Sequence, residues 1–204
     1  MIRRLFSILF LALLIFVLCW NHTLENPKPV QSRYVKFNSQ GTRLGNWEGP
    51  WACVLDSHTG LLWEVKTDDE SIHDGYWTYS WFYENKGVKN SGDCYFENER
   101  CDTSDLIIRA IQQARCGKTN WRLPTANELS TLVIEPTVPG SPSIAIDFFP
   151  QTKHGDYWTA DSSKLLSGVY KHLKEGAIAI DFTDGTTRTI PYRNAAFVRL
   201  VSSN

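Results

Sequence analysis

The sequence is poor in features that would assign a function at once. Its 204 residues carry a formal net charge of −1, and beyond Arg3 and Arg4 no run of basic residues stands out. This balance provides no electrostatic footprint for nucleic acid. The chain also has no Gly-x-y run and no internal repeat, which excludes a collagen-like segment and a repeat architecture.

Motifs for catalysis and for metal binding are missing as well. The five histidines are scattered, without a His-Glu-x-x-His pattern, and no Ser lies in a Gly-x-Ser-x-Gly turn. No glycine-rich loop is present that would cradle a phosphate, and no cysteine pair has Cys-x-x-Cys spacing. We therefore expect a protein that is not an enzyme and that binds no cofactor and no metal.

Aromatic residues are abundant, with eight Trp, eight Tyr and ten Phe. Six of them lie close together in the long, irregular stretch 66–99: Tyr76, Trp77, Tyr79, Trp81, Phe82 and Tyr83. A connection of this length without secondary structure is unusual unless it is functional. Aromatic faces stack on sugar rings, so the cluster is a candidate ligand site, but the same pattern fits a buried strand or a partner interface. Both interpretations stay open at this point.

A second candidate is a modest basic segment before the predicted strand at Ala177. It contains Lys164, Lys171, His172 and Lys174. Lys171 and Lys174 are the candidate ligand contacts in this segment, because an anionic ligand would need clustered cations. The alternative is a solvated loop face.

The N-terminus has the pattern of a targeting segment. Arg3 and Arg4 precede an apolar run from Leu5 to Trp20, interrupted only by Ser7. The run has the size of a signal-peptide core, and it is also close to the roughly 20 residues that span a bilayer. No small-residue cleavage site follows it, which favours an uncleaved signal anchor.

Three segments are predicted on this basis: a signal anchor or signal peptide at 1–20, a polar linker at 21–33 and a folded domain at 34–204. The arginines place the N-terminus in the cytoplasm. The folded domain is therefore expected outside the cytoplasm, anchored in a membrane if the segment is uncleaved and released if it is cleaved.

The cysteine count agrees with export. Four cysteines follow Cys19, and an even number in an exported domain indicates two disulfides with three possible connectivities. Cys94 and Cys101 bracket a short polar loop and are expected to pair. Cys53 would then pair with Cys116.

The strongest local signal is the stretch 120–129. Thr125 and Glu128 form a capping box before an apolar helical pattern, and Pro124 makes the preceding residue extended. This helix is predicted to stop at Glu135-Pro136. An earlier helix is predicted to open at 103–105, with Cys116 on its last turn.

The remaining pattern consists of short strands. They are predicted at 34–37, 51–55, 61–65, 157–160, 177–182, 187–191 and 197–201. The order of strands, then two helices, then strands indicates an α+β domain in which the helices pack on a mainly antiparallel sheet.

Four motifs carry a resemblance to a known family. They are Asp56-x-x-Thr59-Gly60-Leu61-x-Trp63-Glu64, Trp121-Arg122-Leu123-Pro124-Thr125-x-x-Glu128-Leu129, Tyr157-Trp158-Thr159 and Val198-Arg199-Leu200-Val201. Together they resemble the Lcl C-terminal domain family of bacteria, over roughly residues 51–201. The family signature maps onto Asp56, Gly60, Trp63, Trp121, Arg122, Pro124, Thr125, Glu128, Trp158 and Arg199.

The resemblance implies a C-type-lectin-like fold with long loops, in an extracytoplasmic bacterial protein. The expected location is then the bacterial inner membrane with a periplasmic domain, or a secreted or periplasmic form if the N-terminal segment is cleaved. The adhesin after which the family is named is implicated in trimer formation and in binding sulfated glycosaminoglycans, so the expected ligand is a glycan, or alternatively an envelope protein. This chain lacks the collagen-like repeats of that adhesin. The Trp-Arg-Leu-Pro-Thr motif also resembles sulfatase-modifying enzymes, but their chemistry needs late cysteines and none follows Cys116.

Overall fold

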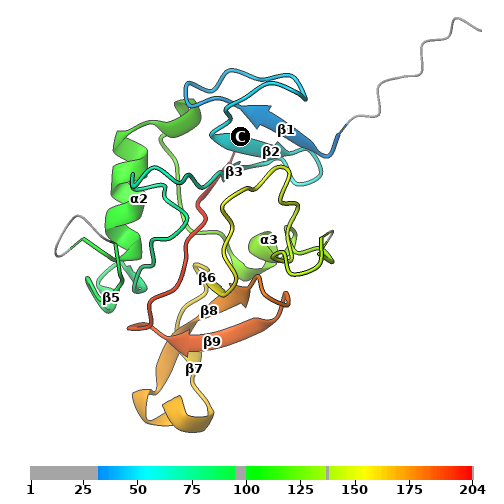
Figure 1. Ribbon diagram of the computed structural model, residues 1–204. Helices are drawn as coiled ribbons and strands as arrows, with labels where there is room; N and C mark the ends of the chain where they lie inside the picture. The colour runs from blue at the N-terminus through cyan, green and yellow to red at the C-terminus, as the bar shows by residue number, and fades with distance from the viewer. Residues whose placement is uncertain (1–31, 95–99, 137, 204) are drawn as a thin grey trace, which may run out of the picture. The chain divides into compact units, whose positions relative to one another are not determined.

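A four-stranded antiparallel sheet brings the start and the end of the folded domain together (Figure 1). The computed structural model describes residues 32–94, 100–136 and 138–203, so the predicted N-terminal segment lies outside the described residues. The sheet has the order β1-β2-β3-β10. Its strands are β1 (Tyr34–Phe37), β2 (Cys53–Asp56), β3 (Leu61–Glu64) and β10 (Val201–Ser203).

The hairpin between β2 and β3 forms as predicted. Cys53 pairs with Glu64 and Asp56 pairs with Leu61 across it. In the turn, the carboxylate of Asp56 accepts the N–H of His58 at 3.0 Å, and Gly60 takes a φ of 71°. Glycine suits this position because a side chain disfavours positive φ.

A second sheet is built around a long central strand. Its strands are β6 (Asp156–Trp158), β7 (Lys164–Leu165), β8 (Glu175–Asp181) and β9 (Thr187–Pro191). The central strand β8 pairs antiparallel with the other three strands. A two-stranded hairpin of β4 (Phe82–Tyr83) and β5 (Lys86–Gly87) lies apart from both sheets.

Two α-helices accompany the sheets in the described part of the chain, namely α2 (Thr103–Gln112) and α3 (Ala126–Ser130). The capping box of Thr125 and Glu128 forms as predicted. The first helix has a cap that sequence reasoning missed, because Asp102 accepts the N–H of Asp105 at 3.0 Å. Within the described ranges, no helix is long and apolar enough to cross a membrane.

The predicted end of α3 is wrong, because the helix stops at Ser130 and does not reach Glu135. The carbonyl of Thr131 accepts a hydrogen bond from Arg33 at 2.8 Å, and the N–H of Ile134 donates to Ser143. These tertiary bonds replace the i to i+4 ladder that would extend the helix.

Cys116 does not lie on the last turn of α2 as predicted. It belongs to a separate 3₁₀ turn, η1 (Arg115–Gly117), where it has a φ of 53°. The disulfide from Cys53 to Cys116 ties this turn to β2, and Cys94 pairs with Cys101. Both predicted disulfides are therefore confirmed, and they indicate an oxidising, extracytoplasmic compartment.

The last predicted strand is wrong in its position, since β10 begins only at Val201. The preceding segment 196–200 connects the two sheets, because its backbone bonds go to different partners. Ala196 pairs with Tyr79, Phe197 pairs with Tyr157 of β6, and the N–H of Leu200 donates to the side chain of Glu64. A segment that changes partner at each step forms no regular ladder.

Two buried clusters make up the core, and the signature tryptophans are divided between them. Trp121 and Trp158 belong to the cluster that includes α2, whereas Trp63 belongs to the cluster beside α3. Because all three tryptophans are buried, they have a structural role in the core.

Candidate functional site

The structure does not bring the predicted aromatic cluster onto one surface. Tyr79 and Trp81 are buried in the core, and Trp77 is partly buried with its indole N–H donated to Ser71 at 2.8 Å. Tyr76 and Tyr83 are exposed, at 62% and 45%. Among the six aromatic residues of the predicted cluster, only these two are exposed.

Backbone pairing explains this division. Tyr79 pairs with Ala196, and the N–H of Trp81 donates to the carbonyl of Tyr192 at 2.9 Å. Side chains alternate along extended backbone, so Tyr79 and Trp81 share one side. The indole N–H of Trp81 donates to the carbonyl of Thr159 at 2.8 Å, which fixes its ring in the interior.

The β4–β5 hairpin holds Tyr83 at the surface. Its two turn residues, Glu84 and Asn85, have φ values of 48° and 63°, as a type I′ turn requires. A Cβ on Gly87 would lie 2.1 Å from the carbonyl oxygen of Trp81, so the strand can approach this closely only with glycine. The position of Tyr83 is thus set by local geometry.

Tyr83 and Trp81 line a pocket of about 300 Å³. The other lining residues are Ile107, Arg122, Leu123, Thr125 and Ala160. They come from α2, from the signature corner before α3 and from the segment after β6. The pocket therefore unites part of the predicted ligand cluster with the signature residues, a combination that the sequence did not indicate.

The single cation of this pocket is already paired. Arg122 donates to both carboxylate oxygens of Glu128, at 2.8 Å and 2.7 Å, and to the carbonyl of Leu123 at 3.1 Å. The hydrogen bond from Arg122 holds the pKa of Glu128 below its usual range. A pocket with apolar walls, one exposed aromatic ring and a neutralised polar edge suits an uncharged ligand.

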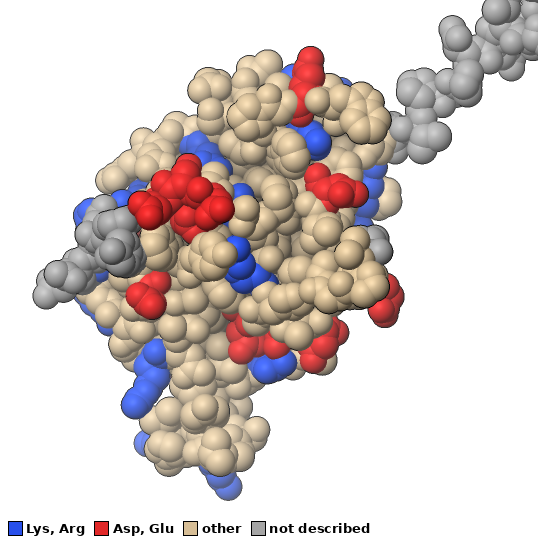
Figure 2. All heavy atoms as spheres, viewed as in Figure 1, with Lys and Arg blue, Asp and Glu red and all other residues tan. Residues whose placement is uncertain are grey.

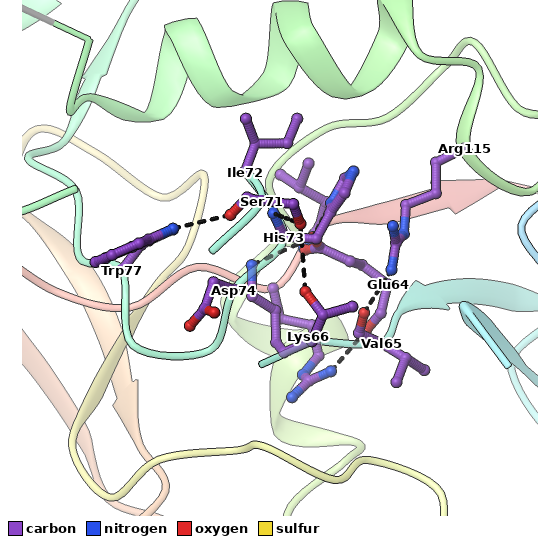
Figure 3. Close-up of polar contacts among 12 residues, drawn as sticks. Glu64, Val65, Lys66, Ser71, Ile72, His73, Asp74, Trp77 and Arg115 are labelled. Carbon is purple, nitrogen blue, oxygen red and sulfur yellow. Dashed lines mark hydrogen bonds and ion pairs between the residues drawn. The ribbon is translucent and has the colours of Figure 1, made fainter. Parts of the chain in front are cut away.

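A second polar centre lies in the interior, and sequence reasoning missed it (Figure 3). The buried carboxylate of Glu64 is its middle. One oxygen lies 3.2 Å from Nζ of Lys66 and 2.6 Å from Nδ1 of His73, and the other accepts the N–H of Leu200 at 3.0 Å. We call Glu64, Lys66, His73, Arg115 and Arg199 the buried ion cluster.

The arginines of the buried ion cluster bind backbone. Arg199 donates to the carbonyl of Glu64 at 2.6 Å and to the hydroxyl of Thr152 at 2.7 Å. Arg115 donates to the carbonyl of Val65 at 2.9 Å. The cluster thus joins β3, η1 and the C-terminal segment, which gives it a structural role.

Burial and charge act against each other in the buried ion cluster. Burial acts to raise the pKa of Glu64, but the charge of Lys66 and the hydrogen bond from His73 hold that pKa far below its ordinary value. Burial lowers the pKa of Lys66 and the pKa of His73. The only clue in the sequence was Glu64, which follows Trp63 in the first motif.

Lys171 and Lys174 do not line the pocket beside Tyr83, and they lie on an extension of the second sheet. They belong to the 3₁₀ turn η2 (Gly168–Leu173) and to the residue after it, between β7 and β8. Figure 1 shows this hairpin projecting below the sheet, away from α2. Within the described residues, no group of three or more His, Cys, Asp or Glu side chains is arranged to hold a metal ion.

Comparison with known proteins gives one match. The model of the Lcl C-terminal domain family matches residues 52–202, which is most of the chain. Searches of curated proteins and of solved structures gave no match. The matched range contains most of both core clusters, both disulfides and the pocket beside Tyr83. The chain therefore belongs to the Lcl C-terminal domain family.

Proposed function

We propose that this protein is an extracytoplasmic binding module of the bacterial envelope, which recognises a glycan in the pocket beside Tyr83. The observation that carries the proposal is an exposed tyrosine ring over apolar walls, next to an arginine already neutralised by Glu128. A pyranose presents an apolar face to such a ring and hydroxyls to the polar edge formed by Arg122 and Thr125.

Binding is proposed in preference to catalysis because of the state of the charged groups. Arg122 is the one charged residue among those that line the pocket, and it is held by Glu128. The charged groups of the buried ion cluster bind one another and backbone carbonyls. Neither arrangement offers a free general base at the pocket.

The finer details of fold and location belong to the same proposal. A C-type-lectin-like fold is supported by the family resemblance and by β10, which closes the sheet of β1 to β3. Attachment to the inner membrane is supported by the apolar run from Leu5 to Trp20 behind two arginines. The two disulfides agree with a periplasmic or secreted domain.

The test is a glycan array probed with the full chain in a mild detergent. Tyr83→Ala should weaken binding roughly fivefold, since one aromatic contact contributes about 1 kcal/mol. Tyr76→Ala is the matched control, because Tyr76 is exposed but does not line the pocket. Equal losses for the two variants, or none for Tyr83→Ala, would refute the pocket as the binding site.

The second candidate ligand is an apolar side chain of an envelope protein. It is favoured by the lining of Ile107, Leu123 and Ala160, which offers few hydrogen bonds to sugar hydroxyls. A photo-crosslinking amino acid at position 83, used in intact cells, tests it. A specific protein adduct together with a blank glycan array would replace the glycan by a protein partner, whereas a glycan hit without an adduct would retain the first proposal.

A further inference from the structure

The hairpin between β7 and β8 exposes apolar side chains in an unusual concentration. We call residues 164–175 the projecting hairpin. Three of the eight large apolar side chains that are exposed in the described residues lie on it, namely Leu165, Val169 and Tyr170. Leu165 is 82% exposed and Val169 is 80% exposed. Single exposed apolar residues are normal, but three within six positions require an explanation.

Cations surround these apolar side chains. The projecting hairpin contains Lys164, Lys171 and Lys174, whereas Glu175 is its one acidic residue. All four are exposed. Figure 2 shows Lys and Arg atoms around the end of this projection, with Asp and Glu atoms gathered nearer the body of the domain. The hairpin is therefore positive in a chain whose net charge is −1.

Backbone hydrogen bonds close the projecting hairpin. The N–H of Leu166 donates to the carbonyl of Lys174 at 2.9 Å, and the N–H of Lys174 donates to Lys171 at 3.1 Å. At the base, a Cβ on Gly176 would lie 2.1 Å from the carbonyl oxygen of Ile190, so β8 and β9 are in close contact there. The apolar and cationic groups are thus presented together by an ordered element, which lowers the entropy lost on contact.

We propose that the projecting hairpin docks onto an anionic phospholipid surface. Leu165 and Val169 would enter the boundary between headgroups and acyl chains, Tyr170 would lie at headgroup level, and the lysines would contact lipid phosphates. Charge complementarity selects anionic lipid over neutral lipid. The apolar side chains favour lipid over a sulfated glycan, which offers them no hydrocarbon to enter. This proposal does not depend on the ligand of the pocket beside Tyr83.

The test measures co-sedimentation with sucrose-loaded vesicles. The full chain is kept in neutral phosphatidylcholine nanodiscs, so that its N-terminal apolar run is shielded from the vesicles. We expect capture by vesicles that contain phosphatidylglycerol, weak capture by pure phosphatidylcholine vesicles, and loss of capture at high salt.

Two double variants test whether the projecting hairpin makes the contact with the vesicles. Leu165→Ser combined with Val169→Ser should lower vesicle affinity at least tenfold, and Lys171→Gln combined with Lys174→Gln should lower it by roughly fivefold for each lysine removed. Trp47→Ser and Lys89→Gln are the matched controls, since both residues are exposed and lie elsewhere. Thermal unfolding of every variant shows that the fold is retained.

Three results would overturn the proposal. Equal capture by anionic and neutral vesicles would exclude charge recognition, and hairpin variants that bind like the wild type would place the contact elsewhere. Retention on heparin beads that depends on Lys171 and Lys174, without any vesicle capture, would identify an anionic glycan as the ligand instead. Tyr83→Ala should leave vesicle capture unchanged, so failure of this proposal and failure of the pocket proposal are distinguishable.

Discussion

The buried ion cluster and the projecting hairpin each hold three Lys or Arg side chains, yet the two regions use them in opposite ways. In the interior, Lys66 and Arg199 are buried and bind the carboxylate and the carbonyl of Glu64. On the hairpin, Lys171 and Lys174 are exposed beside apolar side chains that are also exposed. Cations that lose water must be matched within the fold, whereas hydrated cations next to apolar groups remain available to a partner.

The first prediction concerns the carboxylate of the buried ion cluster. Glu64→Gln removes the charge that compensates Lys66 and weakens the contact to His73, while keeping the side-chain shape. A buried ion left without its partner costs about 3–5 kcal/mol. The free energy of unfolding, measured with urea, should therefore fall by about 3–5 kcal/mol.

Glu175→Gln is the control for this variant, because Glu175 is the exposed acidic residue of the projecting hairpin. Its effect should stay within about 0.5 kcal/mol. If Glu64→Gln changed stability as little as Glu175→Gln, the buried ion cluster would not be a structural centre, and the contrast between the two regions would disappear.

The second prediction is a loss of stability in acid. The pKa of Glu64 lies far below its ordinary value and the pKa of His73 lies below its ordinary value, so in both cases the folded protein disfavours the proton. The contribution of these two groups to the free energy of unfolding is complete at pH values above their pKa values in the unfolded chain. It is lost as the pH falls below those values. Loss should begin below about pH 6.5 for His73 and below about pH 4.5 for Glu64.

The size of this effect is limited to about 1.4 kcal/mol per pH unit for each proton bound. Urea midpoints at pH 7.5, 6.0 and 5.0 measure the contribution of His73, and a further midpoint at about pH 4 measures the start of the contribution of Glu64. His73→Gln should flatten the change between pH 6.5 and 5.0, because it removes the buried group that must be protonated. A wild-type midpoint that rises as the pH falls through this range would contradict the assigned directions.

Much of the fold was predictable where neighbouring residues determine the structure. The capping box of Thr125 and Glu128 and the turn at Gly60 depend on contacts within a few residues. The disulfide pairing followed from cysteine count and spacing. The helix end at Ser130 was missed because it depends on Arg33, which is distant in the sequence.

The candidate site was predictable only in part, for the same reason. Tyr83 and Trp81 belong to the aromatic stretch, but their pocket also needs Arg122 and Ala160, which the fold brings to them. The buried ion cluster was missed because Lys66 and His73 lie in a segment that resembles a solvated loop. Whether an aromatic side chain is exposed depends on pairing partners such as Ala196, which composition does not reveal.

The third prediction tests where the core ends on the projecting hairpin. Leu165 and Leu166 are neighbours in the sequence, but Leu165 is 82% exposed and Leu166 is only 5% exposed. Leu166→Ala should lower the free energy of unfolding by about 2–3 kcal/mol, because it removes a buried side chain. Leu165→Ser combined with Val169→Ser should change it by no more than about 0.5 kcal/mol.

Urea unfolding of these two variants shows which of the apolar side chains the domain needs for its own stability. Apolar side chains that can be removed without loss of stability are not needed by the domain itself, whereas Leu166 anchors the base of the hairpin. If the double serine variant lost as much stability as Leu166→Ala, Leu165 and Val169 would belong to the core, and the projecting hairpin would differ from the buried ion cluster only in degree.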